Sequence, residues 1–397
     1  KICEENFSCE EKFVYLSQIL RRIKSEIMYI HQHKNWTNFP WDNNKLLTLL
    51  ANVRHLQGRL LGQMENLGFK LKEEAVLSTL TLDVLKSTEI EGEILNKDQV
   101  RSSIARKLGL EVSGLVDSPR DVDGVVEMML DATQNYMQSI TTKRLFGWHA
   151  ALFPTGYSGM YKIEVGKYRN GDMQVVSGAM GKEKIHYEAP EANQVESEMN
   201  TFLEWFNNTS ETDPVLKAAI AHFWFVTVHP FDDGNGRIAR AITDMQLARS
   251  DGSPQRFYSM SSQILTERKK YYEILEKTQR GTSDITNWLV WFLSCLENAL
   301  INSGEVLDSV LVKAKFWEKH SQTSLNDRQR FMLNKLLDGF DGKLTSSKWA
   351  KMAKTSQDTA IRDIQDLMDK GILRKEAQGG RSTNYELIID SHTVYCK

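Results

Sequence analysis

The stretch from His229 to Arg240 reads HPFDDGNGRIAR and decides the local fold. Apolar residues recur at helical spacing before it and again after it. Pro230 ends the first of these helices directly after His229. We therefore predict two helices joined by a tight loop at residues 233–236. The apolar residues that define the two helical faces are Leu216, Ala219, Ile220, Phe223 and Val226 before the loop and Ile238, Ile242 and Met245 after it.

The loop has the features of an anion site. Gly234 and Gly236 permit positive φ and let the backbone N–H groups around Asn235 converge on one point. The N-terminus of the second helix adds about half a positive charge. Arg237 and Arg240 are three residues apart, so they share a helix face, and both can pair with phosphate oxygens. We predict that these five residues bind a polyphosphate.

Two acidic residues and a histidine accompany the anion site. Asp233 offers the hard oxygen ligands that suit Mg²⁺ held between protein and phosphates, and Asp232 is the alternative ligand. His229 is the side chain type best suited to accept a proton near neutral pH. We predict that it deprotonates a hydroxyl group, which then attacks a phosphate. The competing interpretation is a surface loop in which the histidine only caps a helix.

The motif resembles the signature of the Fic family, HPFxxGNGRxxR with an acidic residue before the first glycine, and every fixed position matches. The resemblance implies a mainly α fold, with a helical core and a β-hairpin flap. It implies transfer of AMP from ATP to a Ser, Thr or Tyr hydroxyl of a target protein, or of the chain itself. In that scheme His229 is the base, Asp233 binds Mg²⁺ and pyrophosphate leaves. Related cores transfer other phosphate-containing groups or remove AMP, and these activities are alternatives.

Two further segments resemble parts of Fic proteins. Residues 175–178 look like the entry to the flap, where a target peptide would add as a strand, although an ordinary surface hairpin fits the pattern as well. Tyr271 and Tyr272 match the closing helices and would wall an adenine pocket, or they are plain core. The flap residues are Val175, Val176, Ser177 and Gly178.

A short acidic segment resembles the inhibitory pattern (S/T)xxxE(G/N) of the same family. Ser87, Glu91 and Gly92 occupy its fixed positions at the end of an apolar-periodic helix. The resemblance implies that Glu91 pairs with Arg240 and blocks the productive position of the γ-phosphate. A solvated acidic helix end is the alternative. Variants of the neighbouring Glu89 and Glu93 are expected to leave activity unchanged.

Composition fits a cytoplasmic enzyme. The 397 residues carry a formal net charge of −2, which offers no general attraction to nucleic acid or anionic membrane. The four cysteines show no zinc or disulfide spacing, and no segment is apolar enough to span a bilayer. The N-terminus lacks a secretory pattern, and the chain does not begin with methionine. We predict three regions: a helical domain with the inhibitory segment (1–106), the catalytic core (107–301) and a winged-helix-like domain (302–397).

The last region predicts helices at 328–337, 346–353 and 357–369, then a strand-like pair around Gly379-Gly380. This order resembles a winged helix, a common DNA reader. From Asp327 onward thirteen basic and ten acidic residues give only +3. The predicted reading helix carries four aspartates and one basic residue, Arg362. Phosphates would repel the aspartates unless most of them point away. Docking to protein, including a second copy of the chain, is therefore favoured over DNA. A DNA-binding regulator that uses the Fic core as a nucleotide sensor is the alternative function. The aspartates are Asp358, Asp363, Asp366 and Asp369.

Overall fold

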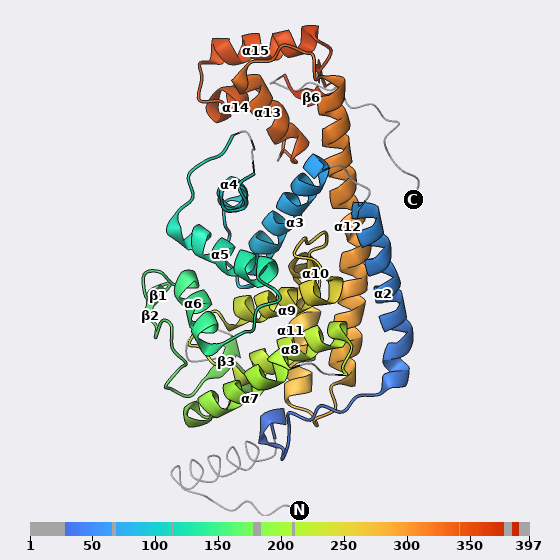
Figure 1. Cartoon of the computed structure of the whole chain (residues 1–397). Helices are drawn as coiled ribbons and strands as arrows, with labels where there is room; N and C mark the ends of the chain where they lie inside the picture. Colours follow the sequence, from blue (N-terminus) through green and yellow to red (C-terminus); the bar gives the residue numbers. More distant parts are fainter. Residues whose placement is uncertain are drawn as a thin grey trace, which may run out of the picture.

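The computed structural model describes residues 28–65, 69–110, 112, 114–177, 184–208, 211–340, 342–376 and 383–388. Helices make up most of this part of the chain, and the strands are short and paired two by two (Figure 1). The predicted mainly α fold class is confirmed.

The first described helices pack against the centre of the molecule. After the 3₁₀ turn η1 (Ile30–Gln32) come α2 (Asn43–Glu65), α3 (Phe69–Ile90) and α4 (Lys97–Leu108). The long helix α12 (Thr286–Lys319) runs beside α2 (Figure 1). Trp36 and Phe39 reach the central helix α8, where their rings lie 5.6–5.9 Å from that of Trp224. The N-terminal helices therefore share one hydrophobic core with the predicted catalytic region.

The central layer is formed by α8 (Pro214–Val228) and α9 (Asn235–Asp251), which pack side by side and flank the motif loop. Every described residue of α8 from Val215 to Val228 is buried, which explains why this helix is apolar on all sides. Around this pair lie α5 (Arg120–Gln134), α6 (Thr142–Leu152), η2 (Ala192–Gln194), α7 (Val195–Asn207), α10 (Met260–Thr266) and α11 (Arg268–Gln279).

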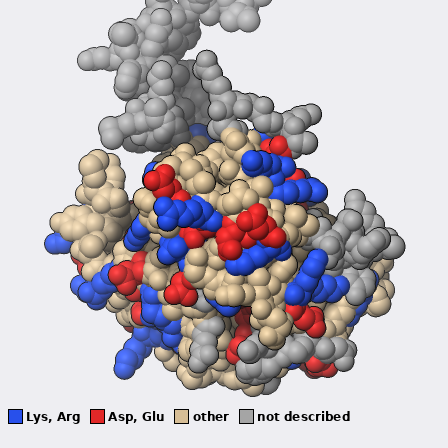
Figure 2. Space-filling view, turned by 90° about the horizontal axis from the view of Figure 1, so that it is seen from above, with Lys and Arg blue, Asp and Glu red and all other residues tan. Residues whose placement is uncertain are grey.

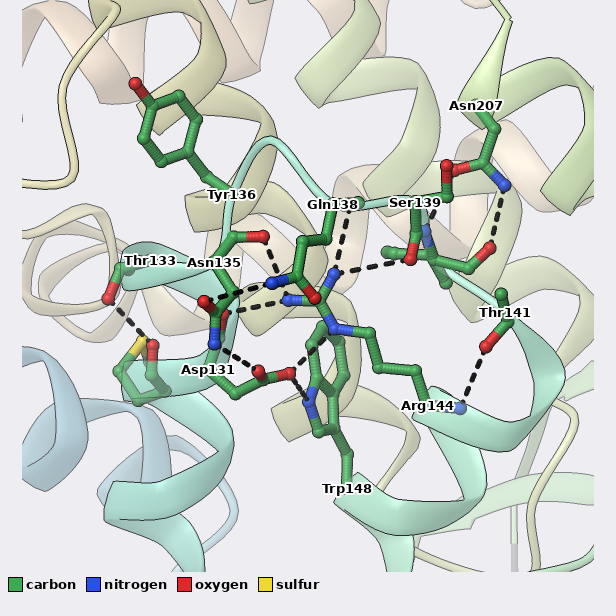
Figure 3. Close-up of polar contacts among 12 residues, drawn as sticks. Asp131, Thr133, Asn135, Tyr136, Gln138, Ser139, Thr141, Arg144, Trp148 and Asn207 are labelled. Atoms are coloured by element: carbon green, nitrogen blue, oxygen red, sulfur yellow. Dashed lines mark hydrogen bonds and ion pairs between the residues drawn. The ribbon is translucent and has the colours of Figure 1, made fainter.

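The connection between α5 and α6 is held by one partly buried arginine. Arg144 donates to the Asp131 carboxylate at 2.7 Å and to the carbonyls of Gln138 and Ser139 (Figure 3). Trp148 donates to the same carboxylate at 2.7 Å. A planar guanidinium with five donors can satisfy several turn carbonyls at once. This network fixes α6, which packs next to the motif loop.

Two short hairpins lie near the motif loop. β1 (Tyr157–Ser158) pairs with β2 (Tyr161–Lys162), and β3 (Gln174–Ser177) pairs with β4 (Lys184–Glu188), both antiparallel. The register between β3 and β4 shifts between Val175 and Val176, so the hairpin is twisted at that point. The predicted flap is therefore a hairpin, and its predicted residue Gly178 lies outside the described residues.

The C-terminal region has a core of its own. Helices α13 (Asp327–Leu337), α14 (Ser346–Met352) and α15 (Gln357–Asp369) and the hairpin β5 (Leu373–Lys375) and β6 (Tyr385–Leu387) surround the buried ring of Trp349. The three helices lie where the sequence predicted them. The predicted turn at 379–380 lies outside the described residues.

The described residues form two hydrophobic cores, one from 30 to 310 and one from 316 to 373. The predicted boundaries at 106 and 302 fall inside α4 and α12, because neither helix contains a proline or cap at that position. The division into three domains stays a prediction.

The exposed charges of the C-terminal region are mixed in sign. Figure 2 looks onto the top of Figure 1 and shows basic and acidic side chains interspersed, with no broad patch of one sign. Of the four aspartates on α15, Asp363 is buried and pairs with Arg328 of α13. Asp366 is half-exposed and accepts from Gln329 of α13. Asp358 and Asp369 are exposed.

Candidate functional site

The histidine of the motif sits where α8 ends. His229 caps the helix in the left-handed conformation, with φ of 51°, and its Nδ1 lies 3.2 Å from the carbonyl oxygen of Val226. In the neutral ring Nδ1 carries the proton and donates to that carbonyl, which leaves Nε2 as an acceptor. Burial lowers the pKa of His229, so the neutral form predominates at neutral pH.

The backbone beside His229 is fixed by Arg169. Its Nε donates to the His229 carbonyl at 2.8 Å, and its backbone N–H donates to the Pro230 carbonyl at 2.9 Å. The Arg169 side chain is 3% exposed, so these bonds are made away from water. A charged donor to a buried carbonyl is among the stronger hydrogen bonds. Arg169 therefore holds His229 in an unfavourable backbone conformation without touching its imidazole.

The motif loop is closed by Asn235. Its Oδ1 accepts from the N–H of Phe231 at 2.9 Å, and its Nδ2 donates to the Phe231 carbonyl at 2.7 Å. Both ends of this side chain are therefore engaged by the loop itself. Asn235, predicted to bind phosphate, offers its backbone N–H at the start of α9, and its side chain shapes the cradle.

The two loop glycines are required for different reasons. Gly234 has φ of 79° at the N-cap of α9, a conformation that favours glycine. A Cβ on Gly236 would lie 2.2 Å from Oε1 of Glu91 and 3.1 Å from Nη1 of Arg240. Gly236 thus allows two charged side chains to approach the anion site.

The two aspartates of the motif have different surroundings. Asp232 accepts from the backbone N–H of Glu164 at 2.9 Å and so ties the loop to a neighbouring segment. Asp233 accepts from the Ser158 hydroxyl and from the N–H of Gly234, and its side chain is 42% exposed. No group of three or more His, Cys, Asp or Glu side chains within metal-binding reach occurs in the described part of the chain. The partly exposed carboxylate of Asp233, which lines the cavity, fits Mg²⁺ that is held mainly by phosphates, because this ion keeps several waters and uses few protein ligands.

The second motif arginine is held by α3. Arg240 is 2% exposed and donates to the hydroxyl and carbonyl oxygens of Ser87, both at 2.8 Å, and to Oε1 of Glu91 at 2.6 Å. Gly92 follows with φ of 91° and lets the chain turn away after α3. The three residues predicted as inhibitory are thus brought together with Arg240.

The first motif arginine is held by the same segment. Arg237 is 3% exposed, and its Nη1 donates to Glu93 Oε2 at 3.0 Å, although the Glu93 side chain is 53% exposed. Glu89 pairs instead with Lys86 at 2.7 Å. Glu93 therefore contacts the motif as well, because the turn at Gly92 brings it back over α9.

The motif opens onto a cavity of about 520 Å³. Tyr271 and Tyr272 both line it, but they differ in burial. Tyr271 is 2% exposed and hydrogen-bonds to His222 Nε2 at 2.9 Å, whereas Tyr272 is 40% exposed. Val175, Val176 and Ser177 of β3 line the same cavity, so the predicted flap residues that the structure describes face the motif. The lining also includes Glu91, His229, Asp232, Asp233, Asn235, Gly236, Arg268 and Glu276.

Two family models match the chain: the Fic/DOC family over residues 139–247, and a domain of unknown function, DUF4172, over residues 29–110. The first match contains the whole cavity-lining motif. The chain contains a Fic domain. Curated relatives carry the same domain name: "Protein adenylyltransferase Fic" from Nematostella vectensis is 24% identical over 297 residues, and that from Aedes aegypti is 26% identical over 227 residues.

These matches cover 70% and 55% of this chain, and 63% and 40% of the two relatives, respectively. The chain therefore aligns with less than two thirds of each relative's length. Among solved structures, a Fic family protein from Desulfovibrio desulfuricans is similar with a TM-score of 0.49 and 21% identity, over 87% of this chain and 96% of that one. None of the helices that the structure describes is long and apolar enough to cross a membrane.

Sequence reasoning missed two residues that shape the site of the Fic domain. Arg169 precedes the flap in the sequence, and its bond to the His229 carbonyl spans 60 positions. Ser158 was not singled out, although its hydroxyl donates to Asp233. Neither contact leaves a local sequence signal, since both depend on loops that meet only in the folded chain.

Proposed function

We propose that this protein transfers AMP from ATP to a Ser, Thr or Tyr hydroxyl of a target protein and that Glu91 restrains the transfer. The observation that carries the proposal is the common cavity. It places His229, whose Nδ1 rather than Nε2 is bonded to Val226, beside Asn235 and Gly236 at the N-terminus of α9. The buried Arg237 and Arg240 follow in the first turns of the same helix. Buried donors on both arginines, Arg237 Nε and Arg240 Nη1, have no hydrogen-bond partner among the described residues. Such donors suit an anionic ligand, because an unsatisfied buried donor is costly.

The residues divide the chemistry between them. His229 accepts the proton of the target hydroxyl at Nε2, and the oxygen attacks the α-phosphate while pyrophosphate leaves. The N–H groups of the motif loop and both arginines stabilise the negative charge that develops on the phosphates. Mg²⁺, held by Asp233 and the phosphates, would neutralise further charge.

The flap would position the target. β3 and β4 pair only with each other in the described part of the chain, so one edge of the hairpin is available to an extended peptide. Val175 and Val176 face the cavity, and a strand added beside them would bring its hydroxyl towards His229. Tyr272, rather than the buried Tyr271, is the better wall for the adenine ring.

Glu91 supplies the restraint. Its carboxylate occupies the position beside Gly236 that an arginine-bound phosphate would need. A tethered carboxylate acts at an effective concentration in the millimolar range. Its charge-assisted bond adds about 1.5–3 kcal/mol, which corresponds to about ten- to a hundredfold in rate.

Incubation with ATP labelled at the α-phosphate, with and without Mg²⁺, tests the proposal. Label that becomes covalently attached to an added target protein and is lost in His229→Ala supports a transferase. Nucleotide binding without transfer, in a Glu91→Gly variant that remains folded, would favour a nucleotide sensor. Release of AMP from an already modified protein would favour the reverse reaction.

A further inference from the structure

Three side chains beside the proposed ATP cavity form a chain of hydrogen bonds that the transfer reaction does not use. The Oγ of Ser177 at the end of β3 lies 2.6 Å from Nε2 of His186 on β4. Nδ1 of the same imidazole lies 2.6 Å from Oε2 of Glu276 on α11. All three line the cavity that also holds His229 and the motif loop.

The polarity of this chain follows from the donors and acceptors. An ionised carboxylate can only accept, so Nδ1 of His186 carries the proton and donates to Glu276. In the neutral imidazole Nε2 is then an acceptor, and the Ser177 hydroxyl donates to it. A hydroxyl, a base and a carboxylate that orients the base are the parts of an activated serine nucleophile.

The arrangement is held by further contacts. Arg280 pairs with Oε1 of Glu276 at 3.3 Å and donates to the carbonyls of Ile185 at 2.6 Å and His186 at 2.9 Å. Lys184 lies 3.8 Å from the same carboxylate oxygen. The β4 backbone is thereby tied to α11, and the imidazole is fixed from both sides. Water could satisfy the hydroxyl of an exposed serine, so Ser177 does not need a fixed imidazole for that purpose.

We propose that Ser177 is an activated nucleophile and an internal acceptor of AMP, with His186 rather than His229 as its base. The AMP step rests on the proposed function, in which ATP occupies this cavity. The Ser177 Oγ forms a bond to the α-phosphorus, the bond to the β-phosphate oxygen breaks, and pyrophosphate leaves. The hydroxyl proton passes to Nε2 of His186. Because the attached AMP fills the shared cavity, the modification stops at one group per chain and competes with external targets.

A fluorophosphonate probe tests the nucleophile without ATP. Its phosphorus bonds to an activated serine oxygen, and fluoride leaves. We expect the probe to label Ser177 in the full-length protein, and His186→Gln to slow labelling by about 10²-fold or more, as for loss of a general base. Glu276→Gln should slow it less, because the base remains. His55→Gln, which changes an exposed histidine of α2, is the matched control and should leave labelling unchanged. No labelling of Ser177, or equal labelling in His186→Gln, overturns the proposal.

The AMP step is tested in a Glu91→Gly background by peptide mapping after reaction with ATP and Mg²⁺. We expect AMP on Ser177 that persists in Glu91→Gly/His229→Ala and is lost in Glu91→Gly/His186→Gln. AMP on other side chains or added proteins but never on Ser177 overturns the internal acceptor and leaves the proposed function standing. No AMP on any protein, with Ser177 still labelled by the probe, instead counts against the proposed function and the AMP step while supporting the nucleophile.

Discussion

The segment around the end of α3 contacts α9 at two places, Arg240 and Arg237, and the two contacts differ in burial. Ser87 and Glu91 accept three hydrogen bonds from the buried guanidinium of Arg240, and the Glu91 side chain is 31% exposed. Glu93 reaches Arg237 from the surface, with more than half of its own side chain in solvent. Exposed ion pairs contribute little, whereas removal of one partner from a buried pair has large effects. The two glutamates, two residues apart, should therefore restrain the proposed transfer unequally.

Loss of His229, the proposed base, should give the largest effect, because neither contact can affect transfer without a base. In the Glu91→Gly background, His229→Ala should lower transfer to external proteins by about 10²–10⁴-fold. Nucleotide binding should be nearly unchanged, since other groups form the anion site. Initial rates of label transfer and equilibrium ATP binding measure both quantities. A rate within threefold of the Glu91→Gly parent would remove His229 from this role.

Arg240 is expected to give the next largest effect. Glu91→Gly/Arg240→Ala should lose the gain of about ten- to a hundredfold that Glu91→Gly confers, because the freed arginine is what positions the phosphates. The same rate assay applies, with thermal unfolding as the control for folding. Full activity in the double variant would mean that Glu91 acts on something other than Arg240.

The contact between Glu93 and Arg237 should affect transfer less than that between Glu91 and Arg240. An exposed pair contributes about 0.2–1 kcal/mol, so Glu93→Gln should raise transfer by no more than about fivefold. Glu89→Gln is the matched control, because Glu89 pairs with Lys86 and not with the motif. If the initial rate of transfer rises as much in Glu93→Gln as in Glu91→Gly, the difference in burial does not determine how strongly each contact restrains transfer.

The pH profile gives the smallest effect. His229 must be neutral to accept a proton, and burial lowers its pKa below the ordinary value of about 6.5. Activity of Glu91→Gly should therefore be retained at pH 6.5 and fall only at more acidic pH. A histidine with an ordinary pKa would lose about half of its base form at pH 6.5. An acid limb centred at or above that pH contradicts the depressed pKa.

The sequence predicted the parts of the site that are local. Residues 229–240 and their apolar flanks predict a helix, a histidine, a glycine loop and a second helix in that order. The resemblance to Fic proteins pointed to the contact between Glu91 and Arg240, which the structure contains. Contacts between distant segments were not predicted. Glu93 meets Arg237 across 144 positions because of a turn at Gly92, and Glu276 meets His186 across 90 positions. Such pairs depend on how whole elements pack, for which a short motif carries no signal.

The fold shows the same limit. Helices of the C-terminal region follow from apolar periodicity and appear where expected. The merging of the N-terminal helices with the catalytic region into one core depends on aromatic contacts such as Phe39 with Phe223, 5.8 Å apart. The contacts of Asp363 and Asp366 likewise depend on partners in α13, which helical spacing alone does not reveal.

The most direct test of the central claim is the initial rate of AMP transfer by Glu91→Gly and by the unchanged protein, at equal folded concentration and saturating ATP and Mg²⁺. A restrained transferase predicts a rise of about ten- to a hundredfold. No rise, in a variant that is folded and binds ATP, would contradict the claim and leave the contact between Glu91 and Arg240 as a structural ion pair.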